Sequence, residues 1–196
     1  MKTLSAEDFW KWFEGEASAI ADAPLDPVTI SNIDRRIHEL DVGLSWEIGP
    51  GQEASMQLVI SPNLDNQLLL KARMIADKAP QVPGWEFHAT RPPKVWNGQS
   101  TIVLEDHGPA DINCAAWEYV LLRYEDDYHE LLLLPIPPLP PLSENEKWEV
   151  ATTVLESILG EEKLMKFNGE YLMVTKLESS LAKQAKPIRN LSEAFK

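Results

Sequence analysis

The chain of 196 residues is 44% hydrophobic and 25% charged, which is typical of a globular protein and excludes an intrinsically disordered one. Its length suffices for one domain with its own core. The net charge of −13 comes from 31 acidic against 18 basic residues, and because a negative field repels phosphate backbones, we expect no direct binding of nucleic acid.

Two amphipathic helices are predicted at the N-terminus. Ser5 followed by Asp8 resembles a capping box, and apolar residues recur behind it at helical spacing, so the first helix is predicted from about residue 6 to residue 21. Asp26-Pro27 is a cap followed by a first-turn proline, and it begins a second helix that ends near Leu40.

The rest of the sequence contains one pattern twice, over residues 44–92 and 117–178: two strands, a helix and a further strand. In the second copy, Ser143 and Glu146 form the capping box of the helix. The pattern predicts an α+β fold with a mostly antiparallel sheet of about six strands. The sheet is built from two ββαβ-like units, helices pack on it, and the two N-terminal helices are additional.

We expect residues 1–178 to form a single α+β domain and residues 179–196 to form a loosely docked basic C-terminal tail, because Pro187 interrupts any helix there. Residues 94–113 fit no clear pattern, although 101–104 has the composition of an edge strand. Residues 131–134 are all Leu, apolar on both faces of a strand. The N-terminal helices or a second subunit, as in a homodimer, would cover the second face.

The single cysteine, Cys114, rules out an internal disulfide and a cluster of zinc-binding thiolates, and it favours a reducing compartment. The N-terminus lacks the apolar segment of a signal peptide, and no later apolar run reaches membrane-spanning length. We therefore expect a cytoplasmic protein that does not associate with a membrane.

Four segments carry a resemblance: Phe9-Trp10-Lys11-Trp12-Phe13, Gly43 to Gly49, the W-x-F-x-A-x-R-P-P strand segment from Trp85 to Pro93, and Leu159-Gly160-Glu161. Together they resemble an uncharacterised family of bacterial cytoplasmic proteins. The resemblance implies a single α+β domain and a bacterial source, but it transfers no catalytic residues, because the shared residues are mostly aromatic and small. The chain differs from the family in its long proline run after Leu134 and in its basic tail.

Glu47, Glu86 and His88 fall on the polar side of their predicted strands. If those strands are neighbours, the three side chains could form a general acid/base pair or half of a metal site. A solvated sheet face displays polar residues in any case, so the structural interpretation is favoured and the catalytic residues stay unknown. No metal site and no cofactor is predicted, since phosphate loops, dinucleotide fingerprints and calcium loops are missing from the sequence.

Three residues are candidates for binding a partner. Trp10 and Trp12 point in different directions from one helix, so Trp10 is a candidate interface anchor. Trp96 lies in a loop beside prolines, and Arg91 ends a strand where its guanidinium could hold a carboxylate or pair with an acid of this chain. The residues 135–142 are rich in proline and are interpreted as a stiff connector between a strand and a helix.

The leading hypothesis is a non-enzymatic protein-interaction or regulatory protein of the bacterial cytoplasm, with neutralisation of a toxin as one version. The partner would be another protein, and the acidity of the chain favours one with a basic patch. The alternative is a small hydrolase or metal-assisted enzyme that uses the Glu/His cluster on the open sheet face.

Overall fold

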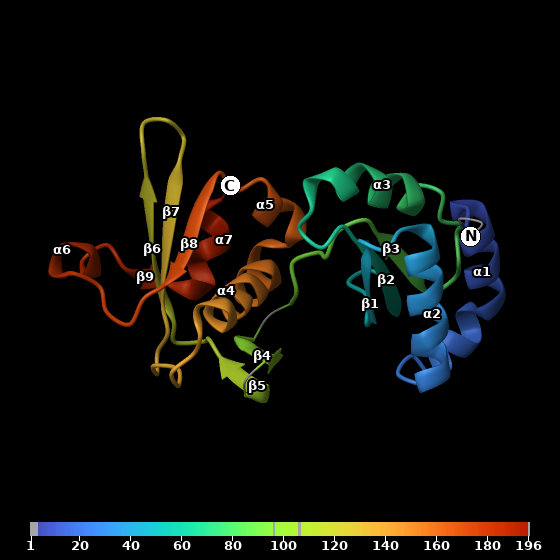
Figure 1. The fold of residues 1–196 in the computed structure, drawn as a ribbon, viewed down its shortest axis with the longest axis horizontal. Coiled ribbons are helices and arrows are strands. Elements are labelled where there is room, and N and C mark those ends of the chain that lie inside the picture. The colour runs from blue at the N-terminus through green and yellow to red at the C-terminus, as the bar shows by residue number, and fades with distance from the viewer. Residues whose placement is uncertain (1–3, 96, 106, 196) are drawn as a thin grey trace. The chain divides into compact units, whose positions relative to one another are not determined.

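The computed structural model describes residues 4–95, 97–105 and 107–195, and it confirms the α+β class. The chain divides into two compact units, the first ending at Arg91 and the second beginning at Pro92, where the sequence suggested one domain (Figure 1). Each unit has its own sheet and its own helices, and each is described separately below.

The N-terminal unit begins with the two predicted helices. Ser5 Oγ accepts a hydrogen bond from the Asp8 backbone N–H at 3.1 Å, and the Asp26 carboxylate accepts two from the first turn of the next helix. Both caps therefore act as the sequence indicates. The elements of this unit are α1 (Ala6–Asp22), α2 (Pro27–Leu40), β1 (Ser45–Gly49), β2 (Met56–Ser61), α3 (Asn66–Ala76) and β3 (Trp85–His88).

The sheet of this unit has the strand order β1-β2-β3. The pair β1–β2 is antiparallel, and β2–β3 is parallel because the chain returns through α3 between them. One face of the sheet packs against the helices around a buried aromatic cluster that includes Phe9, Trp10 and Phe13. On the opposite face of the central strand, Gln57, Val59 and Ser61 are also buried, whereas the sequence pattern suggested a solvated face.

The C-terminal unit contains two sheets. Strands β4 and β5 form an antiparallel ribbon within the segment that the sequence left largely unassigned. The larger sheet has the order β8-β7-β6-β9. The elements are β4 (Gln99–Leu104), β5 (Gly108–Asn113), β6 (Glu118–Arg123), β7 (His129–Leu134), α4 (Glu144–Leu159), α5 (Glu161–Met165), β8 (Gly169–Met173), α6 (Ser179–Ala182), β9 (Lys186–Pro187), the 3-10 turn η1 (Ile188–Asn190) and α7 (Leu191–Ala194).

The two predicted ββαβ units are both present, one in each compact unit. Strands β6 and β7 are antiparallel, and β8 runs parallel to β7 after the helical return through α4 and α5. This repeats the order and directions of β1, β2 and β3. The difference from the sequence prediction is that the strands are distributed over three sheets and do not form one sheet of about six strands.

One face of the apolar strands of the C-terminal unit is covered by a segment that the sequence did not suggest. Val120 and Leu132 pack against Leu177 and Leu181, which belong to the segment that follows β8. The N-terminal helices pack in the core of the other unit. The chain itself therefore supplies part of the cover that was expected from those helices or from a second subunit.

The C-terminal segment is more than a loosely docked tail. Ile188 and Leu191 are fully buried, and β9 pairs with β6. The Ile188 backbone N–H also donates a hydrogen bond to the Trp117 carbonyl at 2.8 Å. Pro187 prevents a continuous helix, as expected, but the short turns on either side of it still bring apolar residues into the core.

Candidate functional site

The structure brings together two members of the predicted Glu/His cluster. Glu86 and His88 are neighbours on one face of β3, and His88 Nε2 lies 3.2 Å from Glu86 Oε1. The same carboxylate accepts hydrogen bonds from the backbone N–H groups of Gln52, Glu53 and Ala54, at 2.7, 2.8 and 3.0 Å. Glu86 therefore holds the loop between β1 and β2 against the edge of the sheet.

These contacts determine the charge of Glu86. Partial burial acts to raise its pKa, but the hydrogen bonds from the Gln52 and Glu53 backbone, from His88 and from the Ala54 backbone outweigh this effect and lower the pKa to about 2. A carboxylate with so low a pKa is a weak general base and is not protonated near neutral pH. The geometry therefore gives Glu86 a structural function.

Glu47 is placed apart from this pair. The strand register puts Val59 between Glu47 on β1 and His88 on β3, so the two polar residues lie two strands apart. Glu47 Oε2 lies 3.8 Å from Arg91 Nε, and Arg91 also donates a hydrogen bond to Ser45 Oγ at 2.8 Å. Arg91 thus contacts an acid of its own chain, which was one of its two expected uses.

Trp10 is not an exposed anchor, because it is only 2% exposed and its indole N–H donates a hydrogen bond to the Ile75 carbonyl at 2.7 Å. Its neighbour Trp12 is half-buried beneath the Arg36 guanidinium, 4.3 Å from the ring centre. The other tryptophan candidate, Trp96, lies outside the described residues. Trp10 is therefore a core residue, whose direction on the helix the sequence alone left open.

Other polar groups in the C-terminal unit are also engaged. His107 Nδ1 lies 2.8 Å from the buried carboxylate of Glu146, which closes the predicted capping box with Ser143. Burial raises the pKa of the Cys114 thiol to about 12, so this cysteine is protonated and unreactive at neutral pH. Among the residues that the structure describes, no group of three or more His, Cys, Asp or Glu could hold a metal ion.

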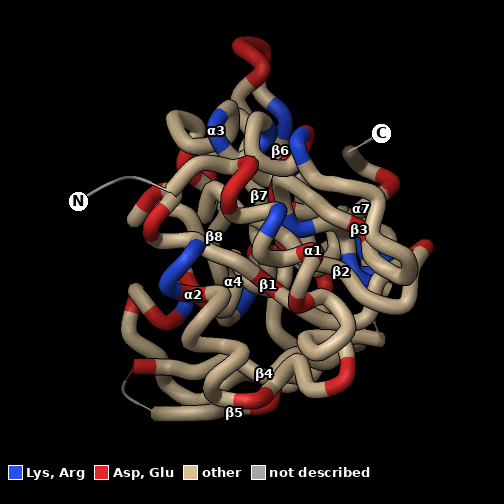
Figure 2. The backbone as a smooth tube through the Cα atoms, turned by 90° about the vertical axis from the view of Figure 1, so that its right-hand side faces the viewer, with Lys and Arg blue, Asp and Glu red and all other residues tan. Residues whose placement is uncertain are grey.

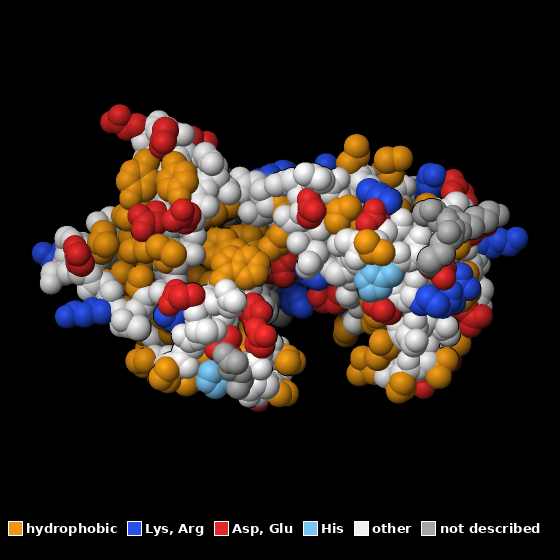
Figure 3. Space-filling view, viewed as in Figure 1, with side chains coloured by type: hydrophobic (Ala, Val, Ile, Leu, Met, Phe, Trp, Pro, Cys, Tyr) orange, Lys and Arg blue, Asp and Glu red, His pale blue; other side chains and the backbone are white. Residues whose placement is uncertain are grey.

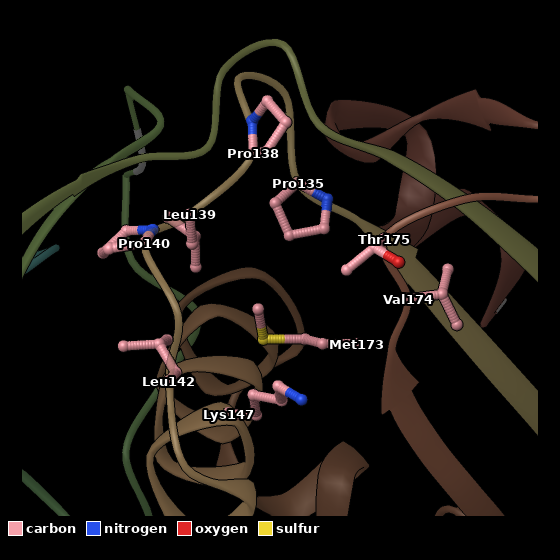
Figure 4. A pocket seen from close by; sticks show the side chains of 9 residues that line it. All are labelled: Pro135, Pro138, Leu139, Pro140, Leu142, Lys147, Met173, Val174 and Thr175. Atoms are coloured by element: carbon pink, nitrogen blue, oxygen red, sulfur yellow. The ribbon is translucent and has the colours of Figure 1, made fainter.

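The C-terminal unit has an apolar groove beside the proline-rich connector, which we call the proline groove (Figure 4). Its volume is about 60 Å3, and it is open to solvent on one side. Met173 extends from the end of β8 toward Leu142, and Lys147 on α4 is its one charged lining residue. The connector supplies Pro135, Pro138, Leu139, Pro140 and Leu142.

The prolines of the connector explain why the groove forms. Proline lacks a backbone N–H and fixes φ, so the connector neither joins the sheet nor coils into a helix. It instead stands beside β8, whose end is held to β7 by the hydrogen bond from the Val174 N–H to the Leu133 carbonyl at 2.8 Å. The sequence identified the connector as stiff, and the structure adds that it forms one side of a binding groove.

Exposed apolar side chains occur next to the proline groove in the sequence. Ile136 is 37% exposed, Leu172 is 45% exposed and Trp148 is 55% exposed, and each directly follows or precedes a lining residue. Figure 3 shows hydrophobic side chains gathered over the region of β7, β8 and α4. Trp148 was not among the candidates from the sequence, although its position next to Lys147, on the outer side of a helix, indicates an exposed tryptophan.

The fold is of the α+β class, and its C-terminal unit has an apolar groove. Comparisons of the chain with protein-family models, with curated proteins and with solved structures find no match. Within the described part of the chain, no helix combines the length and apolar character needed to cross a membrane.

Proposed function

We propose that this chain is a non-enzymatic protein-interaction or regulatory protein of the bacterial cytoplasm, and that the proline groove binds an apolar segment of its partner. The observation that carries this proposal is the apolar lining of the groove, contributed by Leu139, Leu142 and Met173. Burial of apolar surface is the main source of affinity in such contacts.

The size of the groove indicates what it would receive. A volume of about 60 Å3 is well below the range for ligand pockets, roughly 300–1,000 Å3. So small a space suits one apolar side chain of a partner better than a whole small molecule. Trp148, exposed and next in the sequence to the lining residue Lys147, is of the residue type that most often contributes binding energy at protein interfaces.

The charge of the chain favours a basic partner. Lys147 in the groove wall already pairs with Glu144 at 2.6 Å, so the groove itself adds little net charge. The total charge of −13 acts at longer range, where it attracts a protein with a basic patch and raises the rate of encounter. Acidic positions are spread over both units (Figure 2).

The enzyme alternative receives less support. Its central carboxylate, Glu86, is occupied by backbone hydrogen bonds, and Glu47 is separated from it by the central strand. A catalytic pair would need a carboxylate or imidazole within reach of a substrate and with a pKa near the working pH. We therefore do not assign catalysis to this cluster.

The proposal is tested with the variant Leu139→Asp, which places a charge in the groove. The matched control is Leu25→Asp, at a residue 77% exposed in the N-terminal unit. Immobilised protein is used to capture partners from bacterial cytoplasmic extract, and the captured protein is then purified and titrated. We expect Leu139→Asp to weaken binding at least about tenfold, equivalent to about 1.4 kcal/mol, and Leu25→Asp to leave it unchanged. Equal binding by both variants would contradict the groove as the site.

A further inference from the structure

A second pocket of the C-terminal unit has the opposite electrostatic character to the chain as a whole. Its floor is the cross-strand row in which Arg123 of β6 pairs with His129 of β7, and His129 pairs with Gly169 of β8. A side chain at Gly169 would collide with the His129 carbonyl, so only glycine allows β8 to approach here. We call this pocket the basic pocket.

Three cationic side chains reach the basic pocket, two from α5 and its C-terminal end and one from β6. Lys163 comes from α5, Lys166 follows α5, and Arg123 lies at the end of β6. The pocket lining holds these three fixed positive charges and one carboxylate, Asp127, so the lining is net positive in a chain of net charge −13. Such a local reversal of charge favours an anionic ligand.

The three cationic side chains differ in the ion pairs and hydrogen bonds that they already form. Lys163 is exposed and forms no ion pair with any residue that the structure describes. Lys166 pairs with Glu162 at 2.6 Å, and Arg123 donates a hydrogen bond to the Ala194 carbonyl at 2.7 Å. That bond aligns the guanidinium without neutralising it, because a carbonyl carries no net charge. Lys163 and Arg123 are therefore available to an anion.

Aromatic rings form the remaining wall. The Phe167 and Phe195 rings are 5.6 Å apart between centroids, and the His129 ring is 6.0 Å from Phe167. Phe167 follows α5 and Phe195 follows α7, and both line the pocket. The pocket has a volume of about 350 Å3, within the roughly 300–1,000 Å3 of ligand sites.

We propose that the basic pocket binds a phosphate monoester that is joined to an aromatic ring. Lysine and arginine are the side chains that hold phosphate, by charge and by directed N–H donors. The two phenylalanine rings offer a face or edge on which a planar ring can stack. A nucleoside monophosphate and a phosphorylated phenol share this chemistry, and the experiment below separates them.

The test is isothermal titration calorimetry of the full chain at low ionic strength with adenosine 5′-monophosphate, phenyl phosphate and inorganic phosphate. Lys163→Glu reverses one charge in the pocket. Lys176→Glu is the matched control, because Lys176 is exposed and does not line the pocket. Both variants change the net charge equally, so a general effect of charge would affect them alike.

We expect at least one of adenosine 5′-monophosphate and phenyl phosphate to bind more tightly than inorganic phosphate. The tighter of these two ligands shows whether the pocket prefers a nucleoside monophosphate or a phosphorylated phenol. Lys163→Glu should weaken that binding about tenfold or more, Lys176→Glu less than about twofold, and added salt should weaken it in the native protein. The proposal is overturned if neither aromatic phosphate binds, if inorganic phosphate binds equally well, or if the two variants behave alike. None of these results depends on the proline groove.

Discussion

At Glu86, one carboxylate accepts three backbone hydrogen bonds from consecutive residues of the loop between β1 and β2. Glu86 lies on the polar side of its strand, and its carboxylate holds this loop in place. Hydrogen bonds to a charged acceptor contribute roughly 1.5–3 kcal/mol each, more than bonds between neutral groups. The position of Glu86 in the sequence does not show whether its carboxylate holds a loop or takes part in catalysis.

We predict that Glu86→Gln lowers the free energy of unfolding of the N-terminal unit by about 2 kcal/mol, because a neutral amide has one oxygen and no charge for these donors. Urea unfolding followed by tryptophan fluorescence measures the change. Glu53→Gln, in the same loop but exposed, is the control and should alter stability by less than about 0.5 kcal/mol. A loss of equal size in both variants would refute the anchoring function.

The contribution of Glu86 to the free energy of unfolding decreases as the pH falls. The pKa of Glu86 falls from an ordinary 4.5 to about 2 in the folded protein, so its stabilising contribution is complete above about pH 4.5. That contribution is lost as the pH falls from 4.5 toward 2, because the unfolded state then holds a proton at this carboxylate that the folded state has not yet taken up. Unfolding curves between pH 2 and 6 should therefore show a smaller pH dependence for Glu86→Gln than for the native protein.

At the scale of elements, the segment after β8 shows how short pieces of structure can complete a core. Leu177 and Leu181 cover one face of the larger sheet, and Ile188 and Leu191 are buried a few residues later. None of these pieces is a long amphipathic helix, so periodicity gives little signal for them. Their burial depends on β9 pairing with β6, a contact between residues far apart in the sequence.

We predict that Leu191→Ala destabilises the C-terminal unit by about 2–5 kcal/mol, the usual cost of removing a fully buried leucine side chain. Arg189→Ala, two residues earlier and exposed, should change stability by less than about 0.5 kcal/mol. Thermal unfolding monitored by circular dichroism compares the two. Similar melting temperatures for both variants would mean that the segment is dispensable, as a loosely docked tail would be.

At the scale of the whole molecule, each ββαβ unit lies in its own compact part of the chain and has its own apolar core. The core of the N-terminal unit contains α1, α2 and α3 around Leu58 and Ile60. A core of the C-terminal unit includes Val120 and Leu132. Separate cores are the property that allows parts of a chain to fold independently.

We therefore predict that residues 1–91 and 92–196, produced separately, each fold. Each fragment should give a cooperative unfolding transition and well-dispersed amide signals in NMR spectra. The helices α1 and α2 should be required only in the first fragment, so a deletion of residues 1–42 should abolish its folding. An unfolded 92–196 fragment beside a folded full chain would show that the C-terminal unit depends on the N-terminal one.

The sequence by itself determined the features that rest on local chemistry. Ser5, Asp26 and Ser143 identified three helix starts, because a cap is a contact between residues two or three positions apart. The alternation of strands such as that around Trp46 identified the repeated ββαβ pattern, which also needs only neighbouring residues.

The tertiary structure decided what depends on distant residues. Only the strand register separates Glu47 from His88, and only the fold turns Trp10 toward Ile75 and places Phe195 against Phe167. The same holds for the two candidate pockets, whose walls join residues that are more than 30 positions apart in the sequence. Local spacing predicts which face of an element is apolar. It does not predict which other element covers that face, because many distant segments of the chain could do so.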